Sequence, residues 1–154
     1  MTQEWLFTSE SVAAGHPDKL CDAISDAIVD ACLALDPKAK VAVETLVKGR
    51  EDRSHIVLAG EVKLAAGIST PDYVAIARKT AADIGYVDHG IGMDATSEEL
   101  CEVTELITSQ SAHINRGVVQ SVDDQGAGDQ GLMFGYACNE TELYPEHQLS
   151  LIHI

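Results

Sequence analysis

Apolar residues between Lys19 and Leu35 recur with the spacing of an amphipathic helix. They fall three or four positions apart and so share one helical face: Leu20, Ile24, Ala27, Ile28, Ala31 and Leu35. Asp36-Pro37 should end this helix, because the residue before a proline is driven out of the helical region.

Three other segments alternate between apolar and polar positions, as half-buried strands do. They are residues 40–48, 55–65 and 101–108. The polar run 49–54 separates the first two segments, which predicts a hairpin.

The remaining elements complete a two-layer unit. A second helix should begin in Ser69-Thr70-Pro71-Asp72 and end at Gly85, and Trp5–Thr8 is interpreted as an opening strand. The order is then β-α-β-β-α-β, which matches a split βαβ unit: an α+β fold with one sheet and both helices on one face. After Ser109 the periodicity fades, so we expect a loop and then the start of a second, incomplete domain.

The charge balance limits the partners of the chain. Its 154 residues include 10 Lys+Arg and 25 Asp+Glu, a formal net charge of −15, and 45% of them are apolar, enough for a packed core. Such an acidic surface repels nucleic-acid backbones, so nucleic acid is not expected as a partner. An anionic small substrate would need metal cations as intermediaries.

The sequence favours a cytoplasmic protein without membrane contact. No apolar stretch approaches the roughly 20 residues that span a bilayer, and Met1-Thr2-Gln3-Glu4 carries acid where a signal peptide carries base. The four cysteines contain no Cys-x-x-Cys pair, so buried free thiols in a reducing compartment are expected: Cys21, Cys32, Cys101 and Cys138.

Gly15-His16-Pro17-Asp18-Lys19 precedes the first helix, where unpaired N–H groups and the helix dipole favour anions. His16 could donate to phosphate oxygens and Asp18 could hold Mg²⁺. Asp18 is also placed to cap the helix, and capping alone could explain it. The acidic stripe that follows, Asp22, Asp26 and Asp30, is more readily a solvated helix face than a metal site.

Glu44 and Glu61 each lie on a strand face that is otherwise made of Ala, Val or Leu. A solvent-facing sheet surface often carries Glu, which is one interpretation. If the face is covered, each carboxylate needs a cation, and K⁺, Mg²⁺ or a substrate ammonium group would serve.

Gly126-Ala127-Gly128-Asp129-Gln130-Gly131 matches the dinucleotide-binding pattern G-x-G-x-x-G. That pattern also needs a hydrophobic strand before it and an acidic residue about 20 positions later, but residues 120–125 are polar and residue 151 is Leu. We therefore reject the Rossmann interpretation. A glycine-rich turn that brings the backbone close to a ligand, with Asp129 projecting into the site, fits better.

Two long stretches resemble the signature sequences of the S-adenosylmethionine synthase family: FTSESVAAGHPDK at residues 7–19 and GAGDQGLMFGYA at residues 126–137. Shorter stretches follow in the order of the family, at residues 22–27, 43–45, 59–62 and 110–111. The resemblance covers roughly residues 4 to 145, and none is identified for residues 146–154.

The resemblance implies a reaction, its cofactors and an assembly. The sulfur of L-methionine attacks C5′ of ATP and expels triphosphate, which is then hydrolysed to pyrophosphate and phosphate. Mg²⁺ and K⁺ are the implied cofactors, and the implied assembly is a homodimer or homotetramer whose active sites are each built from two chains.

The resemblance also assigns a role to each candidate residue. His16 would be catalytic and contact the ATP phosphates, Asp18 would bind Mg²⁺, and Glu44 would hold K⁺. The residues implied to bind methionine are Glu61, Gln110 and Asp129.

The resemblance divides the chain into three parts: an N-terminal domain at 1–108, a flexible active-site loop and linker at 109–125, and the truncated beginning of a central domain at 126–154. Family chains are more than twice as long, and their later parts carry the cations that bind triphosphate. A truncated reading frame that is inactive alone is therefore expected. The alternative is a non-catalytic module that binds a nucleotide–Mg²⁺ complex or pairs with another chain.

Overall fold

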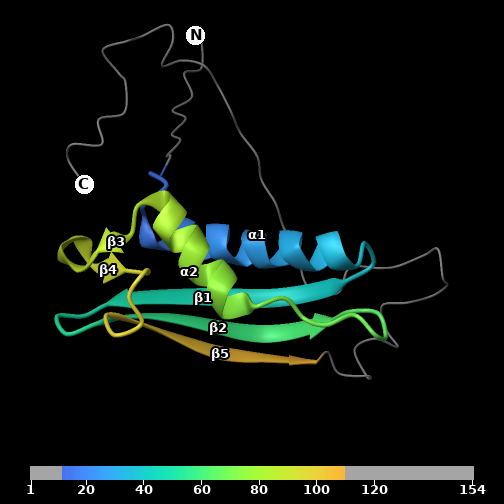
Figure 1. Cartoon of the computed structure of the whole chain (residues 1–154). Coiled ribbons are helices and arrows are strands. Elements are labelled where there is room, and N and C mark those ends of the chain that lie inside the picture. Colours follow the sequence, from blue (N-terminus) through green and yellow to red (C-terminus); the bar gives the residue numbers. More distant parts are fainter. Residues whose placement is uncertain (1–11, 110–154) are drawn as a thin grey trace, which may run out of the picture.

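The computed structural model describes residues 12–109, which form two layers (Figure 1). Two helices lie on one face of a three-stranded sheet, as the α+β prediction required. The elements are α1 (Pro17–Leu35), β1 (Lys40–Gly49), β2 (Ser54–Lys63), α2 (Tyr73–Ile84), β3 (Val87–Asp88), the 3-10 helix η1 (His89–Ile91), β4 (Met93–Asp94) and β5 (Cys101–Ser109).

The sheet has the order β1-β2-β5. β1 and β2 form the predicted antiparallel hairpin, and β5 is parallel to β2. The prediction of a split βαβ unit is wrong in one respect, because a split unit has another strand between its two parallel strands. Here the crossover through α2 returns the chain directly to the free edge of β2. The predicted opening strand, Trp5–Thr8, lies outside the described residues.

The core lies between the sheet and the two helices. α1 buries one face, with Leu20, Ile24, Ile28 and Cys32 each at most 1% exposed. β2 contributes residues on the same side, and α2 contributes a tyrosine and two alanines: Ile56, Leu58, Val62, Tyr73, Ala77 and Ala81. Burying one Leu or Ile side chain stabilises the fold by about 1.5–3 kcal/mol, so the helix layer and the sheet depend on each other.

The two helices end where the sequence predicts. The chain leaves α1 at Asp36-Pro37, and the Asp36 carboxylate accepts hydrogen bonds from the backbone N–H groups of Lys38 and Ala65, at 2.9 and 2.8 Å. Gly85 caps α2 with a φ of +121°, a left-handed conformation that glycine tolerates. Leu35, which was expected on the apolar face, is 47% exposed because it lies in the last turn of α1.

The opposite side of the sheet is covered by no element in residues 12–109 (Figure 1), and we call it the open face. By the strand register it carries Ala42, Glu44, Leu46 and Lys48 of β1, His55, Val57, Ala59, Glu61 and Lys63 of β2, and Glu102, Thr104, Leu106 and Thr108 of β5. Leu46 and Leu106 are each 58% exposed, so the middle of the open face is apolar and accessible. No helix within residues 12–109 is long and apolar enough to cross a membrane.

Candidate functional site

His16, not Asp18, caps the first helix. Its backbone is extended, Pro17 follows at the first helical position, and its Nδ1 accepts a hydrogen bond from the backbone N–H of Asp18 at 3.2 Å. The predicted capping role of Asp18 is therefore wrong, because Asp18 already lies inside the first turn. An acidic residue there still interacts favourably with the positive end of the helix dipole.

The Asp18 carboxylate is accessible. Its side chain is 92% exposed, and its Oδ2 lies 3.9 Å from Nδ1 of His16. A carboxylate in this position can coordinate a hard cation such as Mg²⁺, which prefers oxygen ligands and keeps several of its waters. The neighbouring stripe of Asp22, Asp26 and Asp30 is exposed along α1, which agrees with a solvated helix face.

Tyr86 supports this helix start, and the sequence pattern did not identify it. Its hydroxyl donates a hydrogen bond to the carbonyl of Gly15, the residue before His16. Tyr86 also lines a cavity of about 280 Å³ together with Pro17, Leu20 and residues of β1 and of the β3–β4 region. The available sequence signal was an aromatic residue directly after the helix terminator Gly85.

Glu44 and Glu61 share the open face. Ala42 of β1 pairs with Glu61 of β2, and Glu44 pairs with Ala59, so the two glutamates are diagonal neighbours. Such neighbours are roughly 7–8 Å apart, close enough for two carboxylates to border one ligand-sized space. Glu44 is exposed and Glu61 is half-buried, and Glu44 also lines a cavity of about 450 Å³ that is bordered by residues of α1, β1 and β2.

The end of β5 lies next to Glu61. Thr108 pairs with Glu61 on the open face, and the strand ends at Ser109, which pairs with Val62. Gln110, a predicted methionine contact, follows Ser109 directly in the chain but lies outside the described residues, as does Asp129.

The structure does not bring all the described candidates into one cleft. His16 and Asp18 precede or begin α1 on the helix side of the sheet, whereas Glu44 and Glu61 lie on the open face. They also lie at different positions along β1: Lys48 lines the same cavity as Pro17, whereas Glu44 is in the middle of the strand and Glu61 pairs with Ala42. Four strand residues separate Lys48 from Glu44 and six separate it from Ala42, distances of about 13 and 20 Å. The described candidates therefore form two separate groups, His16 with Asp18 and Glu44 with Glu61.

Residues 12–109 contain no group of three or more His, Cys, Asp or Glu side chains that could hold a metal ion. A metal held by one carboxylate of these residues would take its other ligands from a phosphate, from water or from elsewhere in the protein.

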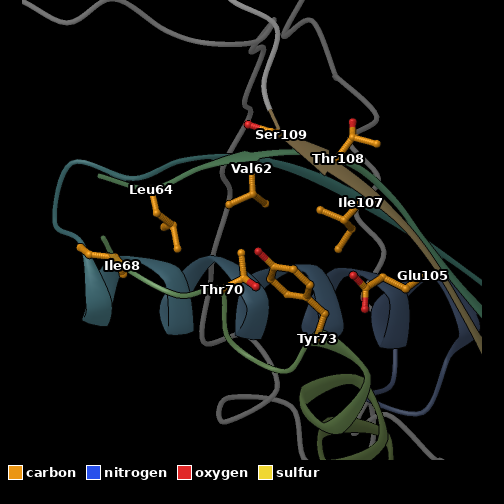
Figure 2. Close-up of a pocket in the computed structure, with 9 residues that line it drawn as sticks. All are labelled: Val62, Leu64, Ile68, Thr70, Tyr73, Glu105, Ile107, Thr108 and Ser109. Carbon is orange, nitrogen blue, oxygen red and sulfur yellow. The ribbon is translucent and has the colours of Figure 1, made fainter. Parts of the chain in front are cut away.

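A third cavity, of about 300 Å³, lies beside Tyr73 (Figure 2) and is lined by none of the candidate residues in the described part of the chain. The Tyr73 side chain is 3% exposed, and burial raises the pKa of its phenol to about 12. The Cys32 thiol is its neighbour, and burial raises the pKa of this thiol too. Both groups therefore stay protonated near neutral pH. For Cys32 this agrees with the expectation of a buried free thiol.

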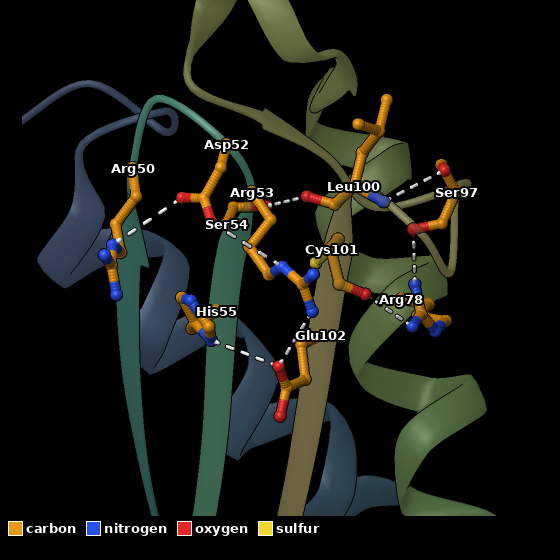
Figure 3. A network of polar contacts seen from close by, with 10 residues as sticks. All are labelled: Arg50, Asp52, Arg53, Ser54, His55, Arg78, Ser97, Leu100, Cys101 and Glu102. Carbon is orange, nitrogen blue, oxygen red and sulfur yellow. Dashed lines mark hydrogen bonds and ion pairs between the residues drawn. The ribbon is translucent and has the colours of Figure 1, made fainter.

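Charged residues cluster where the first hairpin meets β5 (Figure 3). Nη1 of Arg53 lies 3.4 Å from Oε2 of Glu102, and Nδ1 of His55 lies 3.7 Å from the same oxygen. These side chains are between 27% and 50% exposed, and exposed ion pairs contribute at most about 1 kcal/mol. The cluster is a surface network rather than a catalytic constellation.

Comparison with known proteins identifies the kind of protein that these features belong to. A family model described as "S-adenosylmethionine synthetase, N-terminal domain" matches residues 4–112, and one described as the central domain of the same enzyme matches residues 124–151. The likeness thus continues past residue 145, where the resemblance of the motifs ends.

Curated relatives agree with these matches. The S-adenosylmethionine synthases of Porphyromonas gingivalis and Bacteroides fragilis are each 51% identical to the chain over 150 residues. The aligned region covers 97% of this chain and 33% of each relative. The chain therefore belongs to the S-adenosylmethionine synthetase family of methionine adenosyltransferases, and it spans about a third of the length of these relatives.

Proposed function

We propose that these residues form the N-terminal part of an enzyme that makes S-adenosylmethionine from ATP and L-methionine and releases phosphate and pyrophosphate. The match to the N-terminal domain model over residues 4–112 carries this proposal. The reaction needs a neutral sulfur aligned with C5′ and a stabilised triphosphate leaving group, not a catalytic triad. Exposed carboxylates and a histidine at a helix start suit that requirement.

In this proposal each of the two groups forms one half of a binding site, and the two half-sites bind different ligands. His16 donates a hydrogen bond to the ATP phosphates, and Asp18 holds Mg²⁺, which would neutralise phosphate charge beside a protein of net charge −15. On the open face, Glu44 holds K⁺, and Glu61 binds the methionine ammonium group together with Gln110 and Asp129.

Because the half-sites are separated, each complete site needs two copies of the chain. His16 and Asp18 of one copy then face Glu44 and Glu61 of another, in a homodimer or a homotetramer. The accessible apolar middle of the open face, with Leu46 and Leu106, supports self-association at that surface. Residues 1–108 would be the N-terminal domain, 109–125 an active-site loop and linker, and 126–154 the beginning of the central domain, in a cytoplasmic enzyme.

A chimera tests the proposed function. Residues 1–145 replace the matching third of the Porphyromonas gingivalis relative, and formation of S-adenosylmethionine from ATP and methionine is measured. We expect turnover from the chimera and none from the 154-residue chain, which spans a third of the relatives. In the chimera, Asp18→Ala should lower kcat/KM roughly 100-fold, because the phosphates lose a metal ligand.

Asp22→Ala is the matched control, since it removes a carboxylate from the same helix and should change kcat/KM less than twofold. Turnover by the 154-residue chain would contradict the expected inactivity of the isolated chain. A folded chimera that binds ATP without forming product would instead support the second candidate function, a non-catalytic nucleotide–Mg²⁺ or interaction module.

A further inference from the structure

The His16 backbone is held by hydrogen bonds on both sides, and its imidazole by one. Its backbone N–H donates to the Ala13 carbonyl at 2.9 Å, and its own carbonyl accepts from the Leu20 N–H at 2.8 Å. Its ring Nδ1 accepts from the backbone N–H of Asp18 at 3.2 Å. A neutral imidazole carries one N–H, so a ring whose Nδ1 accepts must carry its proton on Nε2.

The Asp18 carboxylate opposes this arrangement only weakly. A carboxylate near Nδ1 favours a proton on that nitrogen, but Oδ2 is 3.9 Å away, beyond hydrogen-bond distance, and its side chain is 92% exposed. Solvent screens such a pair strongly. The backbone N–H is closer and is fixed by the helix, so the capping hydrogen bond decides the tautomer.

Tyr86 holds Gly15, the residue before His16, by a hydrogen bond. Its hydroxyl donates to the Gly15 carbonyl from a segment 71 positions further along the chain. Its backbone is itself anchored: the Tyr86 N–H donates to the Ala81 carbonyl at 3.0 Å, and the Tyr86 carbonyl accepts from the Ala95 N–H at 2.9 Å. The turn before α1 is thus connected through Tyr86 to α2 and to the segment after β4, as well as to α1 itself.

We propose that Tyr86 is a positioning residue that holds the Gly15–His16 turn, so that His16 keeps its Nε2–H tautomer and with it a neutral hydrogen-bond donor. The role of this donor toward phosphate oxygens rests on the proposed function. A neutral donor of fixed orientation binds an anion without a proton transfer, and it needs no reorganisation when the leaving group develops charge.

The test is the tautomer of His16 in the ¹⁵N-labelled 154-residue chain. Long-range ¹H–¹⁵N spectra at pH 8.5, where an ordinary imidazole is neutral, distinguish a protonated ring nitrogen from an accepting one. A His16→Gln spectrum assigns the signals. We expect wild-type His16 to show Nε2 protonated, and Tyr86→Phe to move both ring nitrogens toward the averaged shifts of a mixed tautomer.

Tyr73→Phe is the matched control, because the Tyr73 hydroxyl has no hydrogen-bond partner within the described residues and should leave the His16 signals unchanged. Wild-type His16 protonated on Nδ1, or Tyr86→Phe spectra identical to wild type, would overturn the inference. Both Phe variants keep the ring that packs, so the fold is retained. The tautomer measurement needs no ATP. A negative result would therefore contradict the role of Tyr86 and not the proposed function, whereas an inactive chimera would contradict the proposed function and not the role of Tyr86.

Discussion

Gly60 shows how one residue shapes the strand that carries Glu61. Its φ is +151°, and a Cβ built on it would lie 1.9 Å from the Ala42 carbonyl oxygen, far inside van der Waals contact. Gly60 pairs with Val43 on one side and Ile107 on the other, so it has no room to move away. Only glycine fits between these strands.

Gly60→Ala should therefore lower the free energy of unfolding by about 3 kcal/mol, from backbone strain and overpacking together. Urea unfolding followed by circular dichroism measures the change. Gly67→Ala is the control, because Gly67 also has a positive φ, +87°, but no atom lies within 4 Å of the position that its Cβ would take. Gly67→Ala should lower the free energy of unfolding by about 1 kcal/mol. Equal losses in the two variants would show that the close contact with Ala42 contributes nothing.

The helix cap marks the limit of residue-level prediction. Asp is among the best N-cap residues and His is not, so propensity alone selected Asp18. The decisive signal was Pro17, because proline favours the first helical position and therefore places the cap one residue earlier, at His16. The contact between Tyr86 and Gly15 joins residues 71 positions apart, and no local pattern in the sequence predicts it.

At the scale of elements, Arg78 joins α2 to the segment that leads into β5 (Figure 3). Its guanidinium donates to three backbone carbonyls: those of Ala95 at 3.0 Å, Ser97 at 3.3 Å and Cys101 at 2.7 Å. These carbonyls belong to the irregular stretch between β4 and β5 or to the first residue of β5. A planar group with several donors can satisfy all three at once.

Arg78→Lys should lower the free energy of unfolding by about 2 kcal/mol, because one ammonium group cannot reach all three carbonyls and partly buried acceptors lose a charged donor. Thermal or urea unfolding measures this loss of stability. Lys79→Ala, at the next position, removes an exposed pair with Asp83 and should change the same quantity by less than about 0.5 kcal/mol. A loss for Arg78→Lys no larger than that of the control would contradict the bridging role.

Elements with clear periodicity were predictable, and their neighbours in space were not. Both helices and all three long strands appear within a few residues of their predicted ranges, because three- or four-residue spacing and alternation record which side is buried. The strands β3 and β4 have two residues each, too few to show any period. The direct pairing of β2 with β5 depends on how α2 packs, which a single sequence does not encode locally.

At the scale of the whole molecule, the main feature is the division of the candidate residues. The sequence contains His16, Asp18, Glu44 and Glu61 without saying which of them meet. The register puts the two glutamates together on the open face, and the helix start lies on the other side of the sheet, near Lys48. Along β1, Lys48 is about 13 Å from Glu44 and about 20 Å from Ala42, the partner of Glu61. In the proposed function, a site that uses both groups would therefore take them from two copies of the chain.

Subunit mixing tests this division most directly. Two chimeras are prepared, one with His16→Ala and one with Glu61→Ala, and each should be nearly inactive alone. If a site takes His16 from one copy and Glu61 from another, a mixed pair contains one site with both substitutions and one site with neither.

Refolding the two variants together should therefore restore S-adenosylmethionine formation well above either variant alone, while His16→Ala mixed with His16→Ala,Glu61→Ala should restore none. If both residues served a site within one copy, every site in the first mixture would be damaged. Activity that stays at the level of the separate variants, with mixed pairs demonstrated by mass spectrometry, would contradict the account.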